Sequence, residues 1–109
     1  MERRQFARIK VNLALKFQSL EQLENAISGQ AADLSKGGIF IKTRKVKPVG
    51  TRVQIELPAP QGGTALIKGV VRSLRYQAGR PVGMGIEFEE MDELARELIS
   101  RVIAKNQGK

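Results

Sequence analysis

The chain has 109 residues, of which 41% are hydrophobic and 28% are charged, a composition typical of one globular domain rather than of a disordered segment. It contains no histidine and no cysteine, which excludes disulfides, thiolate chemistry, the commonest general base and most metal-ligand sets. We therefore expect no enzyme, no metal and no cofactor. The first residues have no apolar run behind their arginines, and no stretch of about 18 apolar residues is present to span a bilayer. These features favour a cytoplasmic protein without membrane insertion.

The net charge is +8, and the excess of basic residues is uneven along the chain. Residues 1–50 contain ten basic and four acidic side chains, whereas residues 51–109 contain nine and seven. The first half is therefore expected to face an anionic partner. Nucleic acid, an acidic membrane surface, a nucleotide and an acidic protein are all compatible with this charge.

Six segments have the residue pattern of β-strands, and they span residues 9–17, 26–34, 39–43, 51–57, 64–76 and 82–89. The first is the clearest, because every second residue from Ile9 to Phe17 is apolar. The pattern is irregular around Gly69, which indicates a bulge, and loops are expected at 58–63 and 77–81. Six consecutive strands predict an all-β fold with an antiparallel barrel over residues 9–89.

The pattern changes to a helical period over residues 91–105, where apolar side chains recur three and four positions apart. These side chains are Met91, Leu94, Ala95, Leu98, Ile99, Val102 and Ile103. We expect a terminal amphipathic helix whose apolar stripe packs on the barrel, with dimerisation as the less favoured use. Residues 1–109 are predicted to form a single domain.

Two other surface features have competing interpretations. The basic run from Lys42 to Lys47 is expected to be a solvated loop, although it is also suited to attracting anions or touching nucleic acid. Among the aromatic residues, Phe17, Phe40 and Phe88 are expected in the core. An aromatic stacking surface for single-stranded nucleic acid is therefore poorly supported.

Arg4 and Arg8 lie four positions apart, so their side chains point to the same side in either a strand or a helix. Two guanidinium groups on one side can clamp a phosphate, bond the O6 and N7 edge of guanine, or stack on a planar ring. A solvated basic start to the chain is the alternative interpretation of this pair.

The segment from Asp33 to Gly38 contains an acid, a serine and two glycines at spacing Asp-x-Ser-x-x-Gly. One interpretation is a hairpin turn tightened by the Asp33 and Ser35 side chains, with glycine supplying positive φ. The other is a ligand site, in which Asp33 and Ser35 bond the donor edge of a ligand and glycine permits its close approach.

Together the two motifs resemble the PilZ domain family of bacterial cyclic di-GMP receptors. Their segments here are Arg4-Gln5-Phe6-Ala7-Arg8 and Asp33-Leu34-Ser35-Lys36-Gly37-Gly38, and both the preceding Arg3 and the segment Gly83-Met84-Gly85-Ile86-Glu87-Phe88 are also similar to the family. The resemblance implies a six-stranded barrel whose arginine segment, residues 1–8, folds over a bound cyclic dinucleotide. It covers nearly the whole chain and suggests a stand-alone, single-domain type.

The resemblance also implies a set of ligand contacts. Arg4 and Arg8 would contact the phosphates and guanines, Asp33 and Ser35 the donor edge of guanine, and Arg3 a further phosphate or ring. The residues expected at the cyclic di-GMP site are Arg3, Arg4, Arg8, Asp33, Ser35, Gly37 and Gly38.

The function that follows is a receptor that changes its surface on binding cyclic di-GMP and so regulates a protein effector. The main alternative is a PilZ-like adaptor that binds proteins but has little or no affinity for cyclic di-GMP. A small basic barrel that binds RNA or DNA is a third hypothesis, which predicts affinity for generic oligonucleotides and a steep salt dependence.

Overall fold

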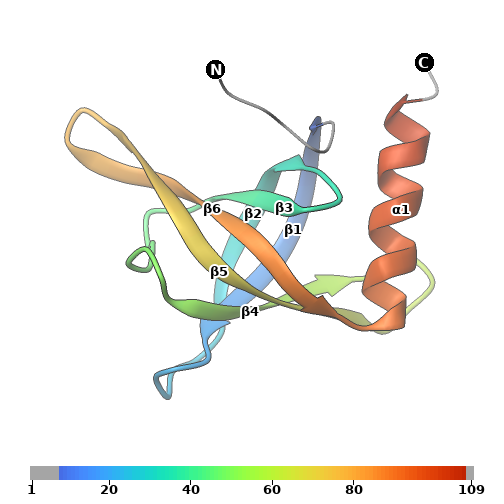
Figure 1. Cartoon of the computed structure of the whole chain (residues 1–109), viewed down its shortest axis with the longest axis horizontal. Helices are drawn as coiled ribbons and strands as arrows, with labels where there is room; N and C mark the ends of the chain where they lie inside the picture. The colour runs from blue at the N-terminus through green and yellow to red at the C-terminus, as the bar shows by residue number, and fades with distance from the viewer. Residues whose placement is uncertain (1–7, 108–109) are drawn as a thin grey trace.

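The computed structural model describes residues 8–107, which form six strands followed by one helix, as expected (Figure 1). The elements are β1 (Ile9–Ser19), β2 (Ile27–Leu34), β3 (Gly38–Lys42), β4 (Arg52–Pro58), β5 (Thr64–Gln77), β6 (Arg80–Met91) and α1 (Glu93–Gln107).

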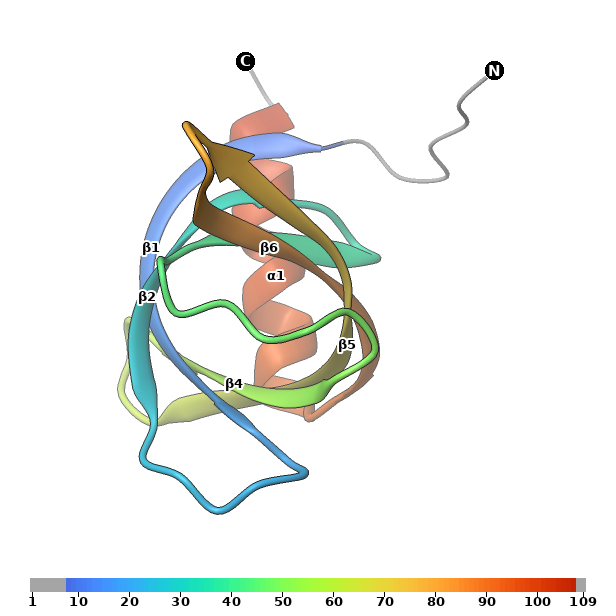
Figure 2. The same ribbon diagram turned by 90° about the vertical axis from the view of Figure 1, so that its left-hand side faces the viewer.

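The strands close into an antiparallel barrel in the order β1-β2-β3-β6-β5-β4, with β4 pairing back to β1. Each strand therefore has a hydrogen-bonded neighbour on both sides over part of its length, which closes the sheet on itself. Figure 2 shows the strands encircling the centre, with α1 behind them. The predicted six-stranded barrel with a terminal helix is confirmed.

The core follows the alternation of apolar residues along the strands. In β4, for example, Val53, Ile55 and Leu57 are buried while the residues between them are partly exposed. The bulge expected near Gly69 is confirmed, because the pairing of β5 with β6 shifts between Lys68 and Gly69. A Cβ at Gly69 would lie 2.5 Å from the Glu87 carbonyl oxygen, so glycine permits this close approach of the two strands.

The apolar stripe of α1 covers one side of the barrel, which is the use that the sequence favoured. Ala95, Ile99 and Ile103 are buried in the same cluster as the strand residues, and the helix contacts β5 and β1. Within residues 8–107, no helix has both the length and the apolar content required to cross a lipid bilayer.

The helix begins two residues later than the expected start at Met91. Met91 instead ends β6, where it pairs with Ile67 of β5. The Asp92 carboxylate accepts a hydrogen bond of 2.9 Å from the N–H of Ala95, as the residue before a helix commonly does. It also accepts one of 3.3 Å from the N–H of Leu66, so the helix start is tied to β5.

The connection between β5 and β6 is shorter than the loop expected over residues 77–81. Only Ala78 and Gly79 lie between the strands, with φ angles of 51° and 77°. Two successive residues with positive φ are typical of the tight hairpin turn that matches strand twist. The resulting hairpin extends to one end of the molecule in Figure 1.

Candidate ligand-binding site

The pairing of β1 with β2 brings together the two segments expected at the site. Ile9 lies opposite Leu34, and Lys10 lies opposite Asp33. Arg8 directly precedes this pair and Ser35 directly follows it, so the arginine enters β1 at the same end of the barrel as the β2–β3 turn (Figure 1). Arg8 is exposed. Arg3 and Arg4 lie outside the described residues.

Asp33 points to the outside of the barrel because β2 contains an irregularity. The pairing of β2 with β3 shifts between Ala31 and Asp33, so both Ala31 and Leu34 are buried although they are three residues apart. The Asp33 side chain is 18% exposed, and its carboxylate lies 3.8 Å from the ammonium of Lys10. Because Lys10 is 93% exposed, this pair is weak and leaves the acid open to exchange for another donor.

Ser35 is buried, and its hydroxyl group is used within the turn. The hydroxyl oxygen accepts hydrogen bonds from the N–H groups of Gly37 at 3.2 Å and Gly38 at 3.1 Å. The N–H of Ser35 also donates to the Gly38 carbonyl at 2.9 Å. This part of the motif therefore forms the tightened hairpin turn, and a ligand contact by Ser35 stays a prediction.

The two glycines of the motif hold β3 close to β6. A Cβ at Gly38 would lie 2.6 Å from the carbonyl oxygen of Ile86, and the Gly37 carbonyl accepts a hydrogen bond of 2.9 Å from the N–H of Phe88. Among residues 8–107, the glycines with positive φ are Gly50, Gly62, Gly63 and Gly79. Gly37 and Gly38 are not among them, so this turn does not use the positive φ that glycine tolerates, and Gly38 instead permits close backbone approach.

Phe40 is buried, as expected, but it lies on the outer face of the barrel beside Asp33 rather than in the cluster that fills the barrel. Ile39 and Ile41 face the core, so the residue between them points outward and pairs with Asp33 on β2 and Gly85 on β6. The ring is nevertheless only 6% exposed. The guanidinium carbon of Arg75 lies 4.2 Å from the ring centroid, so the arginine covers the ring.

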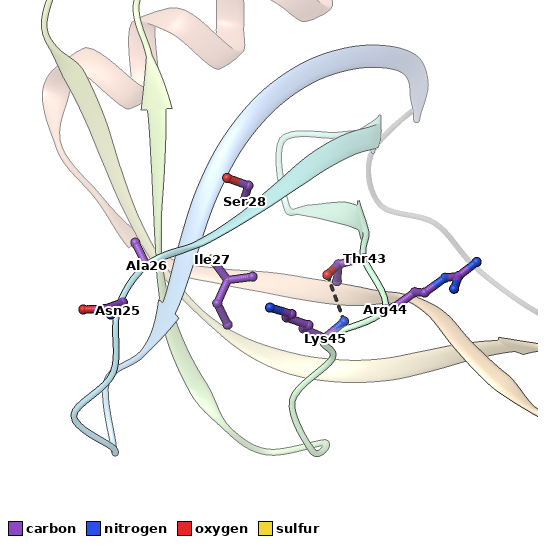
Figure 3. Close-up of a pocket in the computed structure, with 7 residues that line it drawn as sticks. All are labelled: Asn25, Ala26, Ile27, Ser28, Thr43, Arg44 and Lys45. Atoms are coloured by element: carbon purple, nitrogen blue, oxygen red, sulfur yellow. Dashed lines mark hydrogen bonds between the residues drawn. The ribbon is translucent and has the colours of Figure 1, made fainter.

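A pocket beside the basic run lies away from the expected ligand site. It has a volume of about 570 Å³ and lies where the start of β2 faces the segment after β3 (Figure 3). It is lined by Asn25, Ala26, Ile27, Ser28, Thr43, Arg44 and Lys45. In Figure 3 the Arg44 side chain points away from the other lining residues. The pocket lies at the opposite end of β2 from Asp33, so it is separate from the expected site.

The basic run itself is divided between solvent and an ion pair. Lys42, Arg44 and Lys45 are exposed, as expected for a solvated loop. Lys47 instead donates to the Glu24 carboxylate at 2.6 Å, and both side chains are at least four-fifths buried. Among residues 8–107, no cluster of acidic side chains is arranged to hold a metal ion.

A model of the PilZ domain family matches residues 2–105. The chain belongs to the PilZ domain family. The barrel order, the terminal helix and the paired motifs described above are all consistent with this membership. No curated protein matches the chain.

Solved structures similar to this PilZ domain show the same fold. The inhibitor of motility MotI/DgrA from Bacillus subtilis is 20% identical with a TM-score of 0.78, and the match covers 100% of this chain and 54% of that chain. The PilZ domain of YcgR from Escherichia coli, solved with c-di-GMP, is 18% identical with a TM-score of 0.72 and coverages of 97% and 92%. The PilZ domain of CeSA from a cellulose-synthesizing bacterium is 24% identical, with a TM-score of 0.60 and coverages of 94% and 96%.

Proposed function

We propose that this PilZ domain binds cyclic di-GMP at the end of the barrel where Arg8 enters β1, and that it acts as a receptor without catalysis of its own. The observation that carries the proposal is the register of β1 and β2, which places Arg8 and Asp33 at one end of the barrel. The similar YcgR domain, whose structure contains c-di-GMP, supports the choice of ligand.

The chemistry of this end of the barrel suits a ligand with two phosphates and two guanines. A guanidinium group such as that of Arg8 forms paired hydrogen bonds to phosphate or to guanine O6 and N7. The carboxylate of Asp33 is an acceptor for the N–H donors of guanine, and its weak pairing with Lys10 leaves it available. Bidentate contacts contribute about 1–3 kcal/mol each, so three or four reach the roughly 8 kcal/mol of micromolar affinity after ordering costs.

The output of the receptor is proposed to be regulation of a protein effector. Ligand bound across Arg8 and the β2–β3 turn changes the charge and shape of this end of the barrel, which is the kind of change a partner surface can distinguish. If the chain has no measurable affinity for cyclic di-GMP, the result favours a second role, as an adaptor that binds proteins without the nucleotide.

Isothermal titration calorimetry with cyclic di-GMP tests the proposal. We expect binding by the wild type, and a loss of tenfold or more in Arg8→Ala and in Asp33→Ala, because each leaves ligand groups without a partner. Arg44→Ala and Glu56→Ala are the matched controls, since they remove the same charges away from the site. The proposal is contradicted if the wild type does not bind cyclic di-GMP, or if both site variants bind it as tightly as the wild type does.

Competition separates the receptor from a nucleic-acid-binding protein. A receptor prefers cyclic di-GMP to GTP and cyclic di-AMP. A basic barrel that binds RNA or DNA instead binds generic oligonucleotides, with an affinity that falls steeply as salt is raised. Tight binding of oligonucleotides, with no preference for cyclic di-GMP over GTP and cyclic di-AMP, favours a nucleic-acid-binding function.

A further inference from the structure

We propose that Arg75, whose guanidinium group lies over the Phe40 ring, is a base-stacking residue of the cyclic di-GMP site and carries one guanine whose edge is bound by Asp33. The inference rests on the proposed function and adds a residue from β5 to a site otherwise built from β1, β2 and their flanking segments. Neither motif of the sequence includes Arg75 or Phe40.

The barrel register places these residues in adjacent rows on its outer face. Asp33 on β2 lies opposite Phe40 on β3, and Phe40 lies opposite Gly85 on β6. In the next row Gly83 of β6 lies opposite Arg75 of β5. Neighbouring strands are about 4.8 Å apart, so the Phe40 backbone lies one strand from that of Asp33, and the Arg75 backbone lies two strands beyond that of Phe40.

Two glycines on β6 allow Arg75 to span that distance. A Cβ at Gly83 would collide with the Phe40 ring, and one at Gly85 would lie 2.6 Å from the hydroxyl oxygen of Ser73. Because these two positions carry no side chains, side chains from neighbouring strands can lie over β6 there. The ring of Phe40 lies over Gly83, and the guanidinium of Arg75 reaches back from β5 to lie on the ring.

The guanidinium of Arg75 is positioned for a ligand rather than for an ion pair. One of its faces is covered by the ring at 4.2 Å, and the residue as a whole is exposed. Among residues 8–107, no ion pair involves Arg75, so its charge is not matched by a neighbouring carboxylate in that part of the chain.

A guanidinium group can stack on a purine because it is planar and weakly hydrated, and that of Arg75 is exposed on the side away from the Phe40 ring. The far edge of the Phe40 ring lies over Gly83 of β6, two strands from Asp33, so a guanine stacked on Arg75 would extend across β3 to place its edge at the Asp33 carboxylate. The contact with the Phe40 ring also holds the arginine before the ligand arrives, which reduces the conformational entropy lost on binding.

Calorimetric titration of the full chain with cyclic di-GMP tests this role. We expect Arg75→Ala to weaken binding about tenfold, within the range for a cation over a ring. Arg75→Lys keeps the charge but loses the planar group, so we expect most of the same loss. Arg80→Ala, which removes an exposed arginine from the same hairpin, should bind within twofold of the wild type. Circular dichroism and urea unfolding of each variant verify that the barrel is intact.

The outcomes distinguish this inference from the function on which it rests. No binding by the wild type overturns the proposed function and this inference with it. Binding by the wild type together with unchanged or tighter binding by Arg75→Ala overturns the stacking role alone, and tighter binding identifies Arg75 as a cover over Phe40. Full affinity in Arg75→Lys shows that charge, rather than stacking, is what the residue supplies, and also overturns the inference.

Discussion

Asp33 and Ser35 belong to one short motif but have different structural roles. The Asp33 side chain reaches the outer face, where its only described charged neighbour is the exposed Lys10. The Ser35 hydroxyl is buried and bonded to the backbone of its own turn. The turn therefore holds the backbone that presents Asp33, so the serine supports the site through structure as well as through any contact with ligand.

Ser35→Ala should destabilise the fold. The substitution removes the acceptor for the N–H groups of Gly37 and Gly38, and an unsatisfied buried donor costs about 1–3 kcal/mol. Urea unfolding followed by circular dichroism measures the change. Ser28→Ala is the matched control, because Ser28 lies on β2, the strand that leads into this turn, and is exposed. Equal stability of the two variants would show that the turn does not depend on this hydroxyl.

The Glu24 carboxylate joins two loops at the other end of the barrel. Glu24, in the β1–β2 loop, accepts hydrogen bonds of 2.6 Å from Lys47 of the β3–β4 segment and from the N–H of Ser19. The hydrogen bond from the Lys47 ammonium holds the pKa of the Glu24 carboxyl below its ordinary value, and the Ser19 N–H lowers this pKa further. This carboxylate ties the two loops together while it is ionised.

The stability contributed by Glu24 should depend on pH. Its pKa is lower in the folded chain than in the unfolded chain, so the contribution is present above the ordinary carboxyl pKa and is lost as pH falls through the folded value. Urea unfolding should show Glu24→Gln less stable than the wild type at pH 7, with the difference narrowing below pH ~4. Glu97→Gln, on the exposed face of α1, should show no such narrowing. If the difference in unfolding free energy between the wild type and Glu24→Gln did not change with pH, the expected link between stability and the ionisation of Glu24 would be contradicted.

At the scale of the whole molecule, the helix and the barrel share one core. Ile99 projects from α1 into the cluster that contains residues of all six strands, and it is 3% exposed. The apolar stripe of α1, for which the sequence also allowed a role in dimerisation, therefore packs on the barrel of its own chain.

Ile99→Ala should cost about 2–5 kcal/mol, because it removes buried methyl groups and leaves a cavity. This is a large part of the 5–15 kcal/mol typical of a domain, so the urea midpoint should fall markedly. Ser100→Ala, on the exposed side of the same turn, is the control. If the midpoint is unchanged while sedimentation shows loss of a dimer, the stripe serves association instead.

The elements of this fold follow from local patterns in the sequence. Alternation of apolar residues predicts the strands, the change of period predicts the helix, and the two motifs predict the family and the end of the barrel where the site lies. These predictions succeed because each depends on residues that are close in the chain. Local pattern does not determine where an element ends, because pairing with another strand can override it. Met91 fits the helical period, but pairing with Ile67 and capping of the helix by Asp92 place it in a strand.

Tertiary structure alone decides which outward residues meet across the barrel. Phe40 is as apolar as its neighbours, so alternation does not show that the core lies on the side of Ile39 and Ile41. The contact of Phe40 with Arg75 depends on the pairing of β3 with the β5–β6 hairpin, from which β4 separates it in the chain, and on two glycines of β6 that leave room for both side chains. Such a contact is set by barrel closure, because only closure determines which residues of distant segments lie opposite one another.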